Sequence, residues 1–196
     1  MYEIRSEKNI LRKKYSEIRN RIGENEKADF DNRICSRILS LVSYRFAETV
    51  LLYSPIKSEI DITPVALAAL KAGKRVAFPR CSPDGSLMQF HSVRSLDELK
   101  PGMYSIPEPR SDAPVFDKKS LEAGNGCLCL IPALIYDKSG YRIGYGKGYY
   151  DRYLQDFHGT KAGVIYNALI AASVPHGKFD LKVDFTVSEK GVSIIK

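Results

Sequence analysis

Two patterns of hydrophobic and polar positions alternate along the chain and predict helices separated by buried strands. Apolar residues recur every three to four positions, the spacing of one helix face, in residues 3–21, 27–43 and 149–157. Short continuous apolar runs, typical of strands buried on both sides, lie at residues 49–53, 75–79, 127–132, 161–166 and 183–188. Weaker runs predict two further strands at residues 87–91 and 192–195.

One more helix is predicted from its boundary residues. Thr63 is expected as the N-cap, Pro64 as the first helical residue and Gly73 as the residue after the end of a helix over residues 65–72. Strands that alternate with helices imply a mainly parallel sheet with helices on both faces. We therefore predict one α/β domain over residues 1–196, with the strand at 127–132 near its centre.

Composition narrows the class of protein. The chain has 196 residues and lacks an apolar run long enough to cross a membrane. Its start lacks the apolar core of a secretion signal, and its four cysteines fit buried structural thiols in a reducing cytoplasm. The net charge of +7 suits nucleic acid and anionic small molecules equally. No nucleic-acid motif accompanies the charge, which favours small polyanionic substrates.

A glycine-rich stretch is the clearest candidate for chemistry. Gly144, Gly146 and Gly148 alternate with other residues, so the backbone can approach a ligand closely and present N–H groups to an anion. Lys147 adds a mobile cation, and Arg142 adds a planar donor fork. The spacing fits neither the P-loop nor the dinucleotide fingerprint. From the residues alone, both a phosphate site and a plain turn remain open.

Other charged residues are expected on the same side of the sheet. Glu59 follows a buried strand, at the edge where open α/β folds bind ligands, although a solvated loop acid gives the same pattern. Asp151, in the first turn after the glycine stretch, could cap the helix or hold a cation. Lys8 and Arg12 share a helix face that could clamp a polyphosphate or be solvated.

The stretch Gly140-Tyr-Arg-Ile-Gly-Tyr-Gly-Lys-Gly-Tyr-Tyr-Asp-Arg-Tyr-Leu154 closely resembles the signature of the 5-formyltetrahydrofolate cyclo-ligase family. Lys8-Asn-Ile-Leu-Arg12 is similar to the N-terminal motif of that family, and Ser58-Glu59-Ile60 to its substrate-binding segment. Residues 74–79 and 106–109 resemble its middle portion, so that the resemblance covers nearly the whole chain.

The resemblance implies a three-layer, Rossmann-like α/β/α fold, shared with sugar-phosphate isomerases and CoA transferases. It also implies an enzyme that uses ATP and Mg²⁺ to convert 5-formyltetrahydrofolate, with or without a polyglutamate tail, to 5,10-methenyltetrahydrofolate, releasing ADP and phosphate. We expect a cytoplasmic monomer with no nucleic-acid or membrane partner. Two alternatives are a phosphate-ligand enzyme of similar fold without ATP turnover and a basic RNA-binding module.

Site residues follow from the same resemblance. Lys147 and Arg142 are the expected catalytic residues, and Asp151 and Asp184 the expected metal ligands. The expected ATP-binding residues are Lys8, Arg12, Arg142, Ile143, Gly144, Tyr145, Gly146, Lys147, Gly148, Tyr149 and Tyr150. The expected substrate-binding residues are Ser54, Glu59, Met88, Ile106, Pro107 and Tyr150.

Two further points concern single positions. Tyr149 or Tyr150 could stack on a flat ring or simply pack. Ala133 stands where the family usually has glycine, and its Cβ is expected to narrow the approach of the backbone to a ligand.

Overall fold

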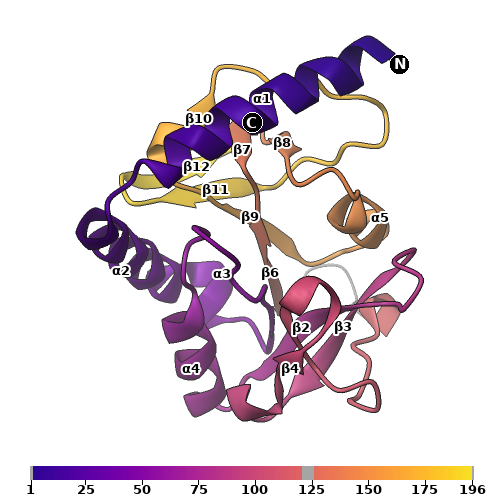
Figure 1. The fold of residues 1–196 in the computed structure, drawn as a ribbon. Coiled ribbons are helices and arrows are strands. Elements are labelled where there is room, and N and C mark those ends of the chain that lie inside the picture. Colours follow the sequence, from indigo (N-terminus) through magenta and orange to yellow (C-terminus); the bar gives the residue numbers. More distant parts are fainter. Residues whose placement is uncertain (1, 121–125, 196) are drawn as a thin grey trace.

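The computed structural model describes residues 2–120 and 126–195, and a large sheet forms its centre (Figure 1). The strands of this sheet are β1 (Thr49–Leu51), β2 (Arg75–Cys81), β3 (Met88–Val93), β6 (Cys127–Pro132), β9 (Thr160–Val164), β11 (Phe185–Ser188) and β12 (Gly191–Ile194). Their order in space is β12-β11-β9-β6-β1-β2-β3. The most apolar run of the sequence, β6, therefore lies in the middle of the sheet, as predicted.

The central sheet is mainly parallel, as predicted. Strand β1 pairs in parallel with β2 and β6, and β9 pairs in parallel with β6 and β11. Only the two edge strands, β3 and β12, pair antiparallel with their neighbours. After β1, the next two strands, β2 and β3, are added on one side of it, and β6 then pairs on its other side. Open α/β sheets bind ligands beyond the carboxyl ends of the strands at such a reversal of order.

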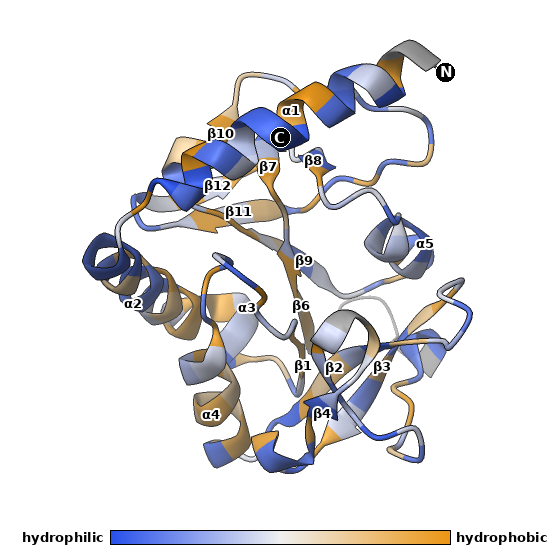
Figure 2. Cartoon of the chain, viewed as in Figure 1, coloured by the Kyte–Doolittle hydropathy of each residue, from blue (hydrophilic) through white to orange (hydrophobic). Residues whose placement is uncertain are grey.

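Helices cover both faces of the sheet. Helices α2 (Glu24–Ser40), α3 (Val42–Arg45) and α4 (Thr63–Lys71) lie on one side, and α5 (Tyr149–Leu154) lies on the other (Figure 1). The buried side chains of Ile34 and Ile38 on α2 and Val65 on α4 join the strands in one hydrophobic core. Figure 2 shows the apolar strands β1 and β6 between these layers. The predicted α/β/α layering is confirmed.

Several predicted boundaries need correction. The helix expected over 27–43 is two helices, because Leu41 has an extended backbone with φ −60° and ψ 139°. Thr63 is the first residue of α4 rather than its N-cap, and its N–H donates to the Asp61 carboxylate at 2.9 Å. Helix α5 ends at Leu154, three residues before the expected end. The predicted role of Gly73 is supported by its φ of +71°, a conformation that favours glycine after a helix.

A second, three-stranded sheet has no counterpart in the predicted elements. It contains β7 (Ile135–Asp137), β8 (Arg142–Ile143) and β10 (Ile170–Ala171), in the order β10-β7-β8. Helix α1 (Tyr2–Asn20) lies over it, with Leu11 and Tyr15 packed against the cluster that includes Ile135 and Ile143. The glycine-rich stretch follows β8 directly, so this sheet and α1 determine where that stretch lies.

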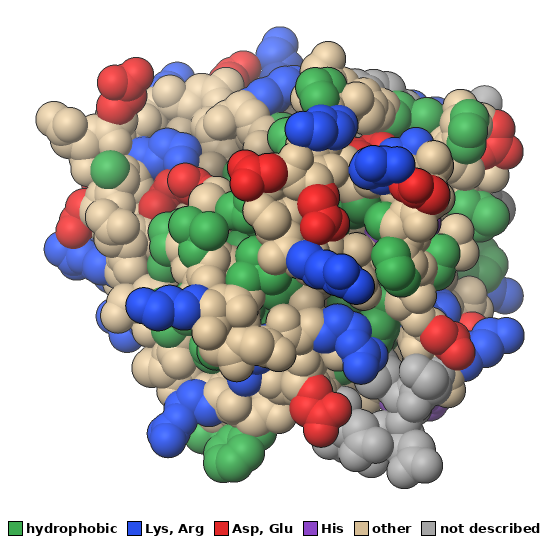
Figure 3. Space-filling view, turned by 90° about the horizontal axis from the view of Figure 1, so that it is seen from below, with side chains coloured by type: hydrophobic (Ala, Val, Ile, Leu, Met, Phe, Trp, Pro, Cys, Tyr) green, Lys and Arg blue, Asp and Glu red, His purple; other side chains and the backbone are tan. Residues whose placement is uncertain are grey.

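The remaining regular elements are short. They are the hairpin of β4 (Lys100–Pro101) and β5 (Pro107–Glu108) and the 3₁₀ turns Leu96–Glu98, Met103–Ser105, Lys118–Ser120 and Asn167–Leu169. Figure 3 shows the molecule from below the view of Figure 1, and on this face Lys, Arg, Asp and Glu side chains are interspersed. The net positive charge therefore forms no continuous basic surface on that face.

The two sheets meet at Tyr136 and Gly163. Tyr136 of β7 is fully buried, and its hydroxyl donates to the carbonyl of Ile131 in β6 at 3.0 Å. Its ring lies against Gly163 of β9, where an added Cβ would be 2.6 Å from the ring carbon Cζ. The absence of a side chain at Gly163 is thus what allows the small sheet to dock on the large one.

We expect Gly163→Ala to lower the free energy of unfolding by about 1–3 kcal/mol, because overpacking forces the Tyr136 ring or the backbone to move. Urea unfolding followed by circular dichroism measures the change. Gly191→Ala is the matched control, since an added Cβ there meets nothing within 4 Å. Equal stability of the two variants would contradict this account of the contact.

Candidate active site

A cleft of about 820 Å³ opens beyond the carboxyl ends of β1, β2 and β6. Its walls come from the loop after β1, the β4–β5 hairpin region, helix α1, the glycine-rich stretch and the first turn of α5. This volume lies within the range of small-molecule and cofactor sites. The cleft also lies at the reversal of strand order, where a ligand site is expected.

The structure brings the predicted ATP and substrate residues around this one cleft. All of them line it, as does the predicted metal ligand Asp151. Asp184 is not among the lining residues. It accepts hydrogen bonds from the backbone N–H of Lys161 at 2.7 Å and pairs with the Lys161 ammonium at 3.2 Å. The structure therefore does not bring Asp184 together with Asp151.

The glycine-rich stretch from Gly144 to Gly148 is folded around Arg12. Arg12 Nε donates to the carbonyl of Gly144 at 2.8 Å, and an added Cβ on Gly146 would lie 3.2 Å from the guanidinium carbon. Gly146 and Gly148 have φ values of +92° and +66°, which favour glycine. The stretch is thus a held loop with its backbone turned toward the cleft, and Arg12 on α1 is its anchor.

Arg142 is buried at the base of the loop. Its Nη2 pairs with Asp151 Oδ1 at 2.9 Å, and its Nη1 donates to the carbonyl of Leu181 at 3.1 Å. The N-cap of α5 is Gly148, and the Asp151 carboxylate also accepts from the N–H of Leu181 at 3.3 Å. Asp151 thus contacts Arg142 and Leu181.

Asp180 is an acidic cleft residue that sequence reasoning missed. It pairs with Lys8 at 2.7 Å and accepts from the N–H of Gly177 at 2.6 Å. Burial raises the pKa of Asp180, but the bonds from Lys8 and Gly177 outweigh burial and hold it below its usual value. The sequence carries one signal for this residue. Asp180 stands four residues before Asp184, the expected metal ligand, in the same segment.

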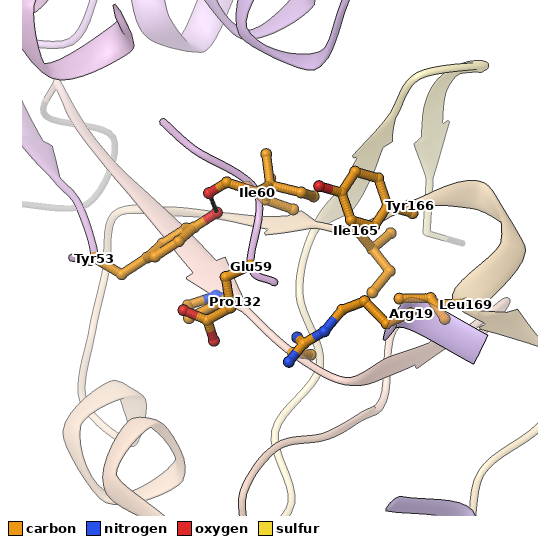
Figure 4. Close-up of a pocket in the computed structure, with 10 residues that line it drawn as sticks. Arg19, Tyr53, Glu59, Ile60, Pro132, Ile165, Tyr166 and Leu169 are labelled. Atoms are coloured by element: carbon orange, nitrogen blue, oxygen red, sulfur yellow. Dashed lines mark hydrogen bonds between the residues drawn. The ribbon is translucent and has the colours of Figure 1, made fainter. Parts of the chain in front are cut away.

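Glu59 also lines the cleft and is buried. Burial raises its pKa, and the N–H of Ile56, which donates to it at 3.0 Å, offsets part of the rise. A small cavity of about 10 Å³ lies beside it, lined by Arg19, Tyr53 and Pro132 among others (Figure 4). Ala133 lines this small cavity and is not among the lining residues of the main cleft.

Apolar side chains complete the wall near Glu59. Met88 is buried and Ile106 is half-buried, while Tyr150 packs edge-on against Phe90 with ring centroids 6.4 Å apart. Tyr149 donates from its hydroxyl to the carbonyl of Gly85 at 3.0 Å. Both tyrosines thus pack against the protein while lining the cleft.

The cleft offers carboxylates suited to a hard cation. Asp151 pairs with Arg142, and the Arg142 charge also acts on Asp180, so both acids lie around one guanidinium. Within residues 2–120 and 126–195 there is no group of three or more His, Cys, Asp or Glu side chains that could hold a metal. Mg²⁺ bound with nucleotides usually takes only one or two carboxylates plus phosphate oxygens and waters, so two acids fit it.

Comparison with known proteins adds to this geometry. Residues 4–189 match the model of the 5-formyltetrahydrofolate cyclo-ligase family. The chain belongs to this family. A solved cyclo-ligase relative, the 5,10-methenyltetrahydrofolate synthetase of Aquifex aeolicus, is 32% identical with a TM-score of 0.83, covering 96% of this chain and 93% of that one. The synthetase of Mycoplasma pneumoniae is 25% identical with a TM-score of 0.74, covering 93% and 98%.

A third cyclo-ligase relative matches over a shorter stretch. The probable 5-formyltetrahydrofolate cyclo-ligase of Schizosaccharomyces pombe is 26% identical over 126 residues, which is 63% of this chain. The match spans 60% of the length of that relative.

Proposed function

We propose that this protein converts 5-formyltetrahydrofolate to 5,10-methenyltetrahydrofolate in an ATP- and Mg²⁺-dependent reaction that releases ADP and phosphate. The observation that carries the proposal is the cleft itself. One wall is the glycine loop that resembles the family signature, and another carries Glu59, the residue that matches the folate-binding position. A nucleotide and a folate placed by these residues would meet in a single space.

The chemistry of the proposed reaction explains why residues that position and neutralise the substrates suffice for catalysis. The formyl oxygen is a poor leaving group until the γ-phosphoryl group of ATP is transferred to it. N10 of the same molecule then attacks the formyl carbon, closes the ring and expels phosphate. Such a reaction needs alignment and charge neutralisation rather than a covalent nucleophile from the protein.

We assign the ATP half of the cleft to the loop and its cations. Lys147, whose exposed side chain lines the cleft, would neutralise the transferring phosphoryl group, and Arg142 would hold Asp151 in the same cleft. Lys8, Arg12, the backbone of residues 143–148, and Tyr149 and Tyr150 would bind the triphosphate and nucleotide. Gly144, Gly146 and Gly148 line the cleft without side chains, so the backbone there is open to a ligand, which supports this assignment.

The folate half would be formed by Glu59, Ser54 and the apolar wall. A buried carboxylate beside flat apolar surfaces suits a pteridine, whose ring edge carries N–H donors. Met88, Ile106, Pro107 and Tyr150 line the same wall. The Ser54 hydroxyl is directed to the carbonyl of Pro107 at 2.5 Å, so Ser54 would fix this wall as well as approach the substrate.

Mg²⁺ would be held by Asp151 and Asp180. We replace Asp184 with Asp180 in this assignment because Asp180 lines the cleft and lies near Arg142 together with Asp151. When bound, Mg²⁺ neutralises phosphate charge and so favours phosphoryl transfer. Asp180 keeps its acceptor oxygens charged at neutral pH, since its pKa lies below the usual value.

We further propose that the protein acts in the cytoplasm as a monomer of one domain, without nucleic acid or membrane. On the face drawn in Figure 3, Lys and Arg side chains are interspersed with Asp and Glu. Among the helices of the described residues, none combines the length and the apolar character that crossing a membrane requires.

Formation of the methenyl product tests the proposed function. Purified protein with 5-formyltetrahydrofolate, Mg²⁺ and ATP should give rising absorbance of the methenyl chromophore, and the same mixture without ATP should not. An absence of signal from folded protein would reject the reaction. Nucleotide-binding and RNA-binding assays would then separate the two alternative functions.

We expect Lys147→Ala and Glu59→Gln to impair different halves of the reaction. Loss of the Lys147 charge should lower kcat about 100-fold with little change in KM for folate, because it acts mainly in the transition state. Glu59→Gln should raise KM for folate about tenfold, since a charge-assisted hydrogen bond is lost. Steady-state kinetics with each substrate varied measures both. The assignment of the two halves fails if the two variants show the same pattern.

We expect Asp180→Asn to raise the Mg²⁺ concentration for half-maximal activity at least about tenfold. Asp184→Asn is the matched control, because this carboxylate lies outside the cleft lining and should leave the Mg²⁺ requirement within about twofold of the wild type. Mg²⁺ titrations of the rate at saturating ATP provide the measurement. The opposite ranking of the two variants would restore Asp184 as the ligand.

A further inference from the structure

Arg19 is a buried cation for which neither the family motifs nor the proposed reaction has a role. It is the second-to-last residue of α1, and only 3% of its surface is exposed. Its Nε donates to Ser58 Oγ at 2.9 Å, and its Nη2 donates to the hydroxyl of Tyr145 at 2.8 Å. A buried guanidinium is costly unless such partners satisfy it, so its placement requires both of them.

Both partners of Arg19 adjoin Glu59. Ser58 immediately precedes Glu59 in the loop after β1, and the Tyr145 hydroxyl lies close enough to the Glu59 carboxylate to lower its pKa. Arg19 and Glu59 also line the same small cavity of about 10 Å³ (Figure 4), which is close to the size of one water molecule. Arg19 thus reaches Glu59 through Tyr145, through Ser58 and across this cavity.

We propose that Arg19 is a positioning residue whose guanidinium fork holds Ser58 and Tyr145, the two residues that adjoin Glu59. Arg19 thereby fixes the Glu59 carboxylate, which is proposed to bind folate, relative to the tip of the glycine loop. The inference rests on the proposed function, because it gives Arg19 a part in folate binding. A fork is needed, since one lysine ammonium on a flexible stem cannot hold two partners in a fixed plane.

The charges around Glu59 add a measurable signature. Arg19 from α1 and Lys57 from the loop of Glu59 itself lower the pKa of Glu59, while its burial raises it. The uncharged groups that face it are the hydroxyls of Tyr53, Tyr145 and Tyr150. Removal of Arg19 deletes one of these two cations, so the pKa of Glu59 must rise.

The phosphate side of the loop is anchored separately. Arg12 holds the carbonyl of Gly144 at 2.8 Å, and this bond does not involve Arg19. Loss of Arg19 should therefore act on folate far more than on ATP.

The test compares Arg19→Met, Arg19→Lys and Tyr145→Phe with the control Arg21→Met, which changes an exposed residue of the same basic segment. Arg19→Met should raise KM for folate about tenfold, as expected when hydrogen bonds from a charged group are lost. KM for ATP should stay within about twofold. Arg21→Met should leave both constants unchanged. Unchanged folate KM in Arg19→Met would overturn the proposal.

Two readouts distinguish positioning from general damage. The double variant Arg19→Met/Tyr145→Phe should be hardly worse than Arg19→Met alone, because the two residues act through one contact. Arg19→Lys should retain the charge and keep the pKa of Glu59 near that of the wild type, yet still weaken folate binding. Fully additive effects, or a lysine variant with wild-type folate KM, would contradict the role of the fork.

NMR titration of the Glu59 side-chain carboxyl in the free protein makes the test independent of turnover. The pKa of Glu59 should be higher in Arg19→Met than in Arg21→Met, even if the wild type proves inactive toward folate. Inactivity of the wild type would reject the proposed reaction, whereas an unchanged Glu59 pKa would reject the link to Arg19. If Arg19→Met does not fold, Tyr145→Phe decides, since an unchanged folate KM in that variant would also overturn the proposal.

Discussion

The contact between Tyr136 and Gly163 is the constraint on which the position of the glycine loop depends. The tyrosine ring occupies the space that a side chain on β9 would fill, and its hydroxyl satisfies a backbone carbonyl of β6. This contact attaches the small sheet to the large one. Strand β8 belongs to the small sheet and carries Arg142 directly into the glycine loop. A packing detail in the core therefore sets the geometry of a surface site.

Two cations of the cleft are already paired with acids, Lys8 with Asp180 and Arg142 with Asp151. A third cation, Arg12, donates to the neutral carbonyl of Gly144. Pairing makes burial of each charge tolerable, because an uncompensated charge in this environment would be costly. Alternating acids and bases also suit a nucleotide with its cation, since the acids can hold a metal while the bases face phosphate oxygens. The charges of the resting cleft thus complement those of the ligand that it is proposed to bind.

The sequence predicted most of the large sheet because its strands are continuous apolar runs. It did not predict β7, β8 and β10, which have only two or three residues each and therefore no measurable period. The cleft residues near the signature were predicted because the resemblance is specific there. Asp180 was missed because two aspartates stand four residues apart, and only the fold determines which one faces the cleft. Sequence pattern cannot resolve such a choice without the path of the chain.

Arg19 was missed for a different reason. Helix α1 has six basic residues, and half of them are exposed, so one buried arginine does not stand out by composition. Its position holds a weak signal, because it lies four residues after Tyr15 and three before Ile22, at the border of the apolar stripe.

Lys8, Arg12 and Arg19 are spaced by four and seven residues, which places all three on one side of α1. They span roughly 16 Å along the helix at 1.5 Å per residue. Lys8 contacts the acid proposed to hold the metal, Arg12 anchors the loop, and Arg19 reaches the surroundings of Glu59. One rigid helix face therefore connects both halves of the cleft. A shift of α1 would displace the phosphate side and the folate side together, which makes the docking of this helix a condition for their alignment.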